Sequence, residues 1–520
     1  MYLTAVILGC NREKDQGEAV NKTLKYQQRQ QDWRNGALIY QVLPDRFVPS
    51  DKLTAKQHLY EAPKVLKDWQ QTPQHGHYLA DSKLWSHEVE FWGGDFASLA
   101  TRLDYIKNLS MDVIYLNPVH LGFTNHKYDS LDFNKVSPEF GQRSDLLKLA
   151  EKIHALDMKL VLDGVFNHMG RNAPIFQQAL ADKTSQYRNW FIFDNTLPEG
   201  YRCWNNAANL PELNLDNPDV QAHLWSDDDS VVQSYLKQGI DGWRLDVAHD
   251  IGYELLKSLT QAAHKVKPDA LIVGEIWCYP NDWLQGSVDG VMNFTVREII
   301  WRTCLKQIKP AIAQAMLAQM VDEIGVEKLL KSWLVLDNHD TPRLATMLPE
   351  YSVQQLARAL MMSLPGSPNI YYGSELGMQG GEDPEMRGPM QWQLNTPDNP
   401  HLHDLTALIN MRNNYPALKI GDIRFINSER LIAFERYTDK VADSVFCLFN
   451  FSEQPVSEYL MTSNSSLMNM GGLINCLTGA HSQIYIKAGL IQVTLPAKSF
   501  MFLAPDTKAK HGYTTYKRVP

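Results

Sequence analysis

The chain has 520 residues, which exceeds the size at which a single hydrophobic core stops growing, so two or three domains are expected. Hydrophobic residues make up 44% of the chain and charged residues 21%, a composition typical of a soluble globular protein. The formal net charge of -9 argues against nucleic acid as a partner, because no basic stripe is present to neutralise phosphates.

The N-terminal residues resemble the end of a bacterial lipoprotein signal. Residues 3–10 (LTAVILGC) are apolar and place a small residue before Cys10, although no positively charged leader precedes them. We expect a lipid anchor at Cys10 and a cell-envelope or periplasmic location, with a cytoplasmic location as the alternative if the resemblance is accidental. Residues 11–35 are polar and are predicted to form a linker or a loosely docked arm. No later segment has the roughly 20 uninterrupted apolar residues that span a bilayer.

Eight short apolar segments are predicted to be strands, with helical patterns such as 99–109 and 146–156 between most of them. This alternation predicts a (β/α)8 TIM barrel of the α/β class. Residues 49–90 form a long insertion without strong periodicity. The eight predicted strands are 37–47, 112–118, 159–167, 239–248, 270–277, 288–294, 332–340 and 368–373.

Two departures from the repeat divide the chain further. Residues 168–214 follow the third strand, are too long for a loop and are poor in helix signals, so they are predicted to be a small inserted domain. The barrel then comprises 37–167 and 215–417. Beyond it, short runs of strand-forming residues predict a C-terminal antiparallel β domain over 418–506, followed by a frayed polar tail at 507–520.

Three carboxylates follow predicted strands at the end where barrels place their chemistry. Asp246, Glu275 and Asp340 end the fourth, fifth and seventh strands, so their side chains are expected to converge. Such a cluster of like charges destabilises a fold and is retained mainly where chemistry needs it. Arg244 lies two residues before Asp246, and a purely structural ion pair is the alternative for these two residues.

Cleavage of a glycosidic bond needs two carboxyl groups in different protonation states. We expect Arg244 to hold Asp246 in its ionised form. Glu275 lies beside Trp277 and has no basic neighbour in its own strand, so we expect it to keep its proton.

Four segments together resemble the principal motifs of the alpha-amylase family of glycoside hydrolases, glycoside hydrolase family 13. They are 163–168 (DGVFNH), 242–248 (GWRLDVA), 274–277 (GEIW) and 337–343 (DNHDTPR). The resemblance covers about 37–505 and implies roles for individual residues. Asp246 is implied to be the nucleophile, Glu275 the acid/base and Asp340 the carboxylate that binds sugar hydroxyls. The residues implied to bind or orient the substrate are Tyr128, His168, Arg244, His339 and Arg343. For the two histidines, a hydrogen-bonded core histidine is the alternative.

Within the family, the sequence is most similar to the neopullulanase, cyclomaltodextrinase and maltogenic amylase group. The segments 40–47 (YQVLPDRF), 125–129 (NHKYD) and 387–392 (RGPMQW) carry this resemblance. Two features depart from it. That group usually has a large N-terminal β domain, whereas about 36 residues precede the first predicted strand here, and the usual Asn-Glu pair after the nucleophile strand is replaced by His249 and Asp250.

The implied function is retaining hydrolysis of α-1,4-glucosidic bonds in maltodextrins, cyclodextrins or pullulan through a covalent glycosyl-enzyme intermediate. The alternatives are an α-1,6-glucosidase or glucanotransferase of the same fold, and a non-catalytic glycan-binding protein. The expected partners are α-glucan oligosaccharides. No cofactor is required, and no metal ligand is assigned. A structural Ca²⁺ is left open by Asn167, which matches a calcium position of many amylases, and by the acidic run 227–229.

Overall fold

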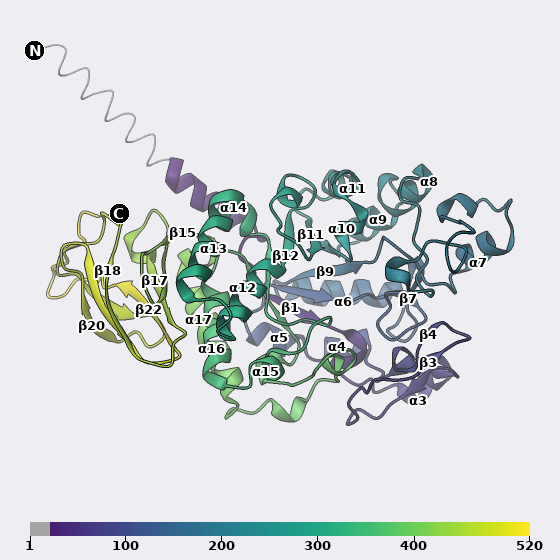
Figure 1. Cartoon of the computed structure of the whole chain (residues 1–520), viewed down its shortest axis with the longest axis horizontal. Helices are drawn as coiled ribbons and strands as arrows, with labels where there is room; N and C mark the ends of the chain where they lie inside the picture. Colours follow the sequence, from purple (N-terminus) through teal and green to yellow (C-terminus); the bar gives the residue numbers. More distant parts are fainter. Residues whose placement is uncertain (1–20, 520) are drawn as a thin grey trace, which may run out of the picture.

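Eight parallel strands close into a barrel at the centre of the molecule (Figure 1). The computed structural model describes residues 21–519. β1 pairs with both β14 and β6, which closes the sheet, so the predicted TIM barrel is confirmed. In chain order the barrel strands are β1 (Ile39–Val42), β6 (Val113–Leu116), β9 (Lys159–Gly164), β10 (Gly242–Leu245), β11 (Leu271–Ile276), β12 (Gly290–Asn293), β13 (Trp333–Val335) and β14 (Ser367–Tyr371).

Each barrel strand is buried on both faces, which explains why the strands read as continuous apolar runs. In β6, Val113 and Tyr115 belong to the cluster inside the barrel, whereas Ile114 and Leu116 pack outward under the helices. The covering helices are amphipathic. In α6 (Arg143–Ala155), for example, Leu146, Leu149, Ala150 and Ile153 are buried at helical spacing. The other long covering helices are α11 (Tyr253–Val266), α12 (Phe294–Cys304), α13 (Pro310–Ile324), α16 (Tyr351–Ser363) and α17 (Pro400–Asn414).

All eight barrel strands are shorter than the predicted ranges, and two predicted elements are divided. The predicted strand 37–47 ends at Val42, and Pro44–Phe47 form the short helix α2. Pro44 is the first helical residue, where its missing N–H costs no hydrogen bond. The helix expected over 99–109 is divided into α4 (Phe96–Ala100) and α5 (Leu103–Asn108).

The insertions and the C-terminal domain lie at opposite ends of the molecule (Figure 1). Residues 49–90 form two small strand pairs, β2 (Val65–Leu66) with β5 (Glu90–Phe91) and β3 (Tyr78–Leu79) with β4 (Leu84–Trp85). The segment 168–214 consists of single β-bridges and short helices. It also contains α7 (Pro174–Ala181), which the weak helix signals did not predict.

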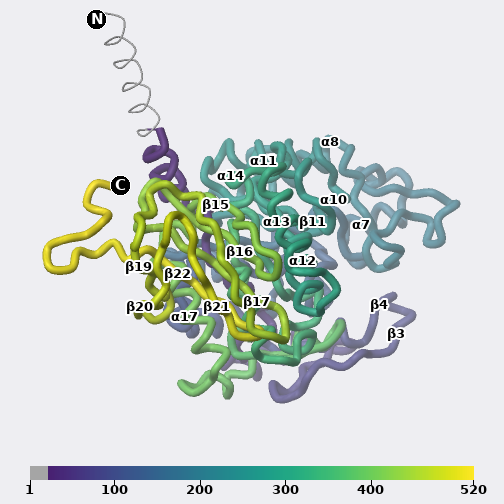
Figure 2. The backbone as a smooth tube through the Cα atoms, turned by 60° about the vertical axis from the view of Figure 1, so that its left-hand side comes forward, coloured from purple at the N-terminus to yellow at the C-terminus, as the bar shows by residue number. Residues whose placement is uncertain are grey.

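The C-terminal region is an antiparallel β structure with its own hydrophobic core, as predicted (Figure 2). Its tail is not frayed throughout, because Tyr516 is buried in that core. The six-stranded sheet has the order β15 (Asp422–Phe425), β16 (Ile432–Tyr437), β17 (Val445–Asn450), β22 (Ser499–Pro505), β19 (Gly472–Asn475) and β20 (His481–Tyr485), and a second pair joins β18 (Val456–Met461) to β21 (Leu490–Leu495).

The segment predicted to be a linker is firmly docked from residue 21 onward. Residues 21–31 are helical, and the buried Arg29 donates to the Ile420 carbonyl at 2.8 Å and pairs with Asp422 at 2.9 Å. The expectation of a loosely docked arm is therefore wrong for this part. Cys10 lies outside the described residues, and its lipidation remains a prediction. None of the helices within 21–519 is long and apolar enough to cross a membrane.

Candidate active site

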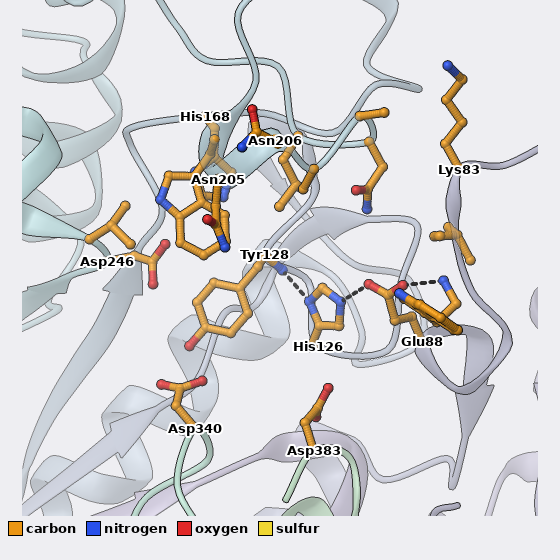
Figure 3. A pocket seen from close by; sticks show the side chains of 18 of the residues that line it. Lys83, Glu88, His126, Tyr128, His168, Asn205, Asn206, Asp246, Asp340 and Asp383 are labelled. Atoms are coloured by element: carbon orange, nitrogen blue, oxygen red, sulfur yellow. Dashed lines mark hydrogen bonds and ion pairs between the residues drawn. The ribbon is translucent and has the colours of Figure 1, made fainter. Parts of the chain in front are cut away.

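A cleft of about 810 Å³ opens at the carboxyl ends of the barrel strands (Figure 3). Asp246, Glu275 and Asp340 all line it, as the strand-end argument predicted. Tyr128 and His168 line it as well. The structure therefore brings together five of the eight residues predicted for the site at the wall of one cleft.

Arg244 is the centre of the charged network below the cleft. Its side chain is fully buried, and its Nη1 lies 2.8 Å from Asp163 Oδ1 and 2.9 Å from Asp246 Oδ1. Its Nη2 lies 2.9 Å from Glu275 Oε2. The three carboxylates come from adjacent strands or strand ends, since β10 pairs with β9 on one side and with β11 on the other. One guanidinium therefore holds Asp246 and Glu275 next to each other.

The surroundings of Glu275 differ from the prediction. Its Oε1 accepts a hydrogen bond from the Trp277 indole at 2.9 Å, and its Oε2 accepts one from the Val247 N–H at 2.8 Å. No basic residue lies in the strand of Glu275, as predicted, but Arg244 reaches Glu275 from the adjacent strand, so the inference that Glu275 is remote from positive charge is wrong. The sequence of a single strand does not show which side chains of a neighbouring strand contact it.

Val247 is a functional residue that sequence reasoning missed. It follows Asp246 with a left-handed backbone at φ 38°, which is a costly conformation for a β-branched residue. This turn directs the Val247 N–H at the Glu275 carboxylate. The backbone that carries the predicted nucleophile thus also orients the predicted acid/base.

Burial and mutual repulsion act against Arg244 on the carboxyl groups of this network. Burial raises the pKa of Asp246 well above its usual value, against the opposing effect of Arg244, and the neighbouring Glu275, Asp163 and Asp340 raise it further. Burial also raises the pKa of Asp163 and of Asp340. Burial therefore opposes full ionisation of Asp246, Asp163 and Asp340, and Arg244 offsets part of this effect.

Tyr128 lines the cleft and packs on His339, which is buried and does not line it. Their rings are parallel within 4° at a centroid distance of 5.5 Å, and the Tyr128 hydroxyl contacts His339 Nε2. The same hydroxyl donates to Asp163 at 2.9 Å. Gln41 donates to His339 Nδ1 at 2.8 Å, which leaves the proton on Nε2, 3.1 Å from Asp340 Oδ2. Burial lowers the pKa of His339 well below its usual value, so the ring is neutral.

His168 has the features of a ligand-binding histidine. It is buried and stacks on Trp204 at 5.4 Å, yet neither of its ring nitrogens has a hydrogen-bond partner among residues 21–519. Burial lowers its pKa to about 3, so the neutral ring has one donor and one acceptor to offer. An unpaired polar group at the wall of a cleft indicates a polar ligand, which disfavours the alternative of a hydrogen-bonded core histidine.

Arg387 is a second residue of the site that sequence reasoning did not assign. Its Nη2 lies 3.3 Å from Asp340 Oδ1, its Nη1 lies 3.2 Å from Asp383, and its Nε donates to the His339 carbonyl at 2.8 Å. It therefore fixes the position of Asp340. Arg387 is the first residue of the RGPMQW segment, and this was the sequence feature that could have identified it as a site residue.

The position of Arg343 does not fit the substrate-binding role that the resemblance implied. It is fully buried outside the cleft, donates to the carbonyls of Met386 at 3.0 Å and Tyr372 at 2.8 Å, and lies over the Tyr371 ring. The motif fixes its position in sequence, but its side chain points into the protein. We assign it to the support of the loop after β14.

Replacing this residue tests the assignment. Arg343→Met is expected to lower the Tm by roughly 3 °C or more, because two buried carbonyls lose their donor, and to leave the KM for maltotriose unchanged. Calorimetry and steady-state kinetics measure the two quantities. A tenfold rise in KM at an unchanged Tm would return Arg343 to the substrate-binding residues.

The structural Ca²⁺ that the sequence left open remains a prediction. Within 21–519, no group of three or more His, Cys, Asp and Glu side chains is arranged to hold a metal ion. The Asn167 carbonyl accepts from the Leu213 N–H at 3.0 Å, and residues 227–229 are exposed. We derive no step that uses calcium.

Comparison with known proteins identifies the family of the chain. Residues 41–421 match the family model described as Alpha amylase, catalytic domain. The chain is 30% identical to Neopullulanase 2 of Thermoactinomyces vulgaris over 91% of this chain and 78% of the relative. It is 31% identical to Intracellular maltogenic amylase of Bacillus subtilis, over 73% of this chain and 62% of the relative.

A solved structure of a hydrolase is similar to this chain over most of its length. The cyclic alpha-maltosyl-(1→6)-maltose hydrolase of Arthrobacter globiformis, in complex with that sugar, aligns with a TM-score of 0.76 at 27% identity, over 91% of this chain and 99% of the other. The chain belongs to the alpha-amylase family, as the four motifs predicted. The names of its relatives also confirm the predicted resemblance to the neopullulanase and maltogenic amylase group.

Proposed function

We propose that this protein is a retaining glycoside hydrolase that cleaves α-1,4-glucosidic bonds of maltodextrins, cyclodextrins or pullulan. The observation that carries the proposal is that Asp246 and Glu275 share the guanidinium of Arg244 at the wall of the cleft. The residues around them supply hydrogen bonds for sugar hydroxyls. The names of the relatives, which include a neopullulanase and a maltogenic amylase, support the substrate class.

In the first step, Glu275 gives its proton to the glycosidic oxygen while an oxygen of Asp246 attacks the anomeric carbon. The C–O bond to the leaving sugar breaks, and the glycone becomes covalently bound to Asp246. In the second step, Glu275 takes a proton from water, the water oxygen attacks the anomeric carbon, and Asp246 leaves as a carboxylate. The configuration is retained because two inversions occur.

The other residues stabilise this sequence of steps. Arg244 keeps Asp246 anionic for attack and receives it again as the leaving carboxylate. We expect Asp340, held by Arg387, and the neutral ring of His168 to bind sugar hydroxyls as charge develops at the anomeric carbon. His339 does not line the cleft, and we expect it to position Asp340, from which its Nε2 lies 3.1 Å.

Chromatography of the products from maltoheptaose, β-cyclodextrin and pullulan tests the proposal. Shorter maltodextrins formed by wild type and not by Asp246→Ala support it. Cleavage only of isomaltose, included as a fourth substrate, would favour the α-1,6-glucosidase, and products longer than the substrate would favour the glucanotransferase. Absence of any product would favour the glycan-binding protein. The convergence of all three carboxylates at one cleft argues against that alternative.

The pH dependence of kcat/KM is expected to be bell-shaped, with its acidic limb above the ordinary aspartate value of 3.8, because burial raises the pKa of Asp246. Asp246 attacks only as an anion, so activity is present above this raised pKa and is lost as the pH falls through it. A basic limb is expected because the reaction needs a protonated general acid. A profile over about pH 3 to 9 measures both limbs. An acidic limb below 3.8 would contradict the assignment of Asp246.

The cellular location is a separate proposal. The printed name of the Bacillus subtilis relative, Intracellular maltogenic amylase, supports the cytoplasmic alternative. The segment 3–10 supports an envelope location, and the lipid anchor at Cys10 remains a prediction.

A further inference from the structure

The β3–β4 hairpin belongs to the wall of the catalytic cleft. Tyr78 and Leu84 from its strands and Lys83 from its turn line the cleft together with Trp85 and Glu88. The rings of Tyr78 and Trp85 pack edge to face at 5.6 Å, which gives the hairpin a small apolar centre. A segment without clear periodicity in the sequence thus becomes part of the site.

The base of the hairpin is coupled to the sugar-binding residues. Glu88 Oε1 lies 3.1 Å from His126 Nε2, and His126 Nδ1 accepts the Tyr128 N–H at 3.1 Å (Figure 3). Glu88 also accepts the Trp85 N–H. A continuous chain of hydrogen bonds therefore fixes the hairpin relative to Tyr128.

The tip of the hairpin contacts the opposite wall. Lys83 forms an ion pair with Glu199, which belongs to the segment inserted after β9 and lines the same cleft. Both side chains are partly shielded, with exposed fractions of 27% and 30%. Lys83 holds a left-handed backbone at φ 54°, unusual for a residue other than glycine. The insertions 49–90 and 168–214, which are far apart in the sequence, thus contact each other across the cleft.

The position of this ion pair relative to Asp246 and Glu275 indicates which end of the cleft it closes. Figure 3 shows Asp246 on one side of Tyr128, and Lys83 and Glu88 on the other. Glu275 protonates the leaving oxygen, so the leaving sugar lies on the side of Glu275 and Trp277. With the glycone stacked on Tyr128, as the resemblance implies, its non-reducing end would extend to the side away from Asp246, where Figure 3 shows Lys83.

We propose that the Lys83–Glu199 ion pair closes the glycone end of the cleft, so that short linear maltodextrins, attacked from the non-reducing end, are the preferred substrates. This inference rests on the proposed function. In a cyclic substrate or in the interior of a long chain, many glucose units lie on the glycone side of the cleaved bond. These units would collide with the ion pair. A partly exposed ion pair is weak, so its opening slows these substrates rather than excluding them.

Two forms of one substrate test the proposal. A linear maltoheptaoside is compared with the same molecule carrying a 4,6-O-ethylidene group on its non-reducing glucose. Wild type is expected to cleave the blocked form much more slowly. Lys83→Ala and Glu199→Ala are each expected to raise the ratio of blocked to unblocked kcat/KM by about fivefold. The double charge swap of Lys83→Glu with Glu199→Lys is expected to restore the wild-type ratio.

Lys67→Ala is the matched control. Lys67 pairs with Glu90 at 3.2 Å in the same insertion, with similar exposed fractions of 26% and 21%, and neither residue lines the cleft. It is expected to leave the ratio unchanged. Equal cleavage of both forms by wild type, or an unchanged ratio in both alanine variants, would overturn the inference. Failure of wild type to cleave the unblocked form would instead overturn the proposed function and with it the role of the ion pair.

Discussion

Asp246→Ala is expected to lower kcat on maltoheptaose by at least about 10⁴-fold, because the variant has no nucleophile to form the glycosyl-enzyme. Binding of maltodextrin is expected to persist, since His168, Tyr128 and Asp340 remain at the wall of the cleft. Steady-state kinetics and calorimetric titration measure the two effects. Azide is expected to restore part of the rate and to form a glycosyl azide of inverted configuration, since a small anion fits where the carboxylate was removed.

Asp241→Ala provides the control for this variant. Asp241 is a buried carboxylate at the opposite end of β10, where it pairs with Lys267 at 2.7 Å and His154 at 2.6 Å. Its loss is expected to lower the Tm while kcat of the folded enzyme stays near that of wild type, because the amino ends of barrel strands serve stability. Substantial turnover by Asp246→Ala without azide would show that another group is the nucleophile.

Glu275→Gln is expected to lower kcat/KM on maltoheptaose by about 10³-fold and on α-maltosyl fluoride by less than about tenfold. Fluoride leaves without a proton, whereas a sugar needs one, so the loss depends on the leaving group if Glu275 is the acid. The glutamine keeps the shape of the side chain and an acceptor for Trp277. Parallel kinetics on the two substrates measure the difference.

Equal losses on both substrates would contradict the assignment. They would mean that Glu275 acts through the position of Arg244 and Val247, which it contacts, rather than through proton transfer.

The barrel could be predicted because buried parallel strands leave a local signal. Each strand is a short apolar run, and the order of runs and helices defines the topology. The convergence of Asp246, Glu275 and Asp340 followed from the same argument, since all three end strands of one barrel.

What could not be predicted depends on contacts between distant segments. The ion pair of Arg244 with Glu275 joins two strands, and the conformation of Val247 is set by the strand end that it closes. Arg343 lies in a motif, but only the packing of Tyr371 and Tyr372 determines where its side chain points. The contact of Lys83 with Glu199 unites two insertions that carry no periodic signal.

The central claim is that Asp246 becomes covalently bound to the glycone. The most direct test is to incubate the wild-type enzyme with 5-fluoro-α-D-glucosyl fluoride, digest it with pepsin and locate the added sugar mass by mass spectrometry. The account predicts one modified peptide, which contains Asp246 and is absent from Asp246→Ala. A sugar attached to a peptide that lacks Asp246 would contradict it.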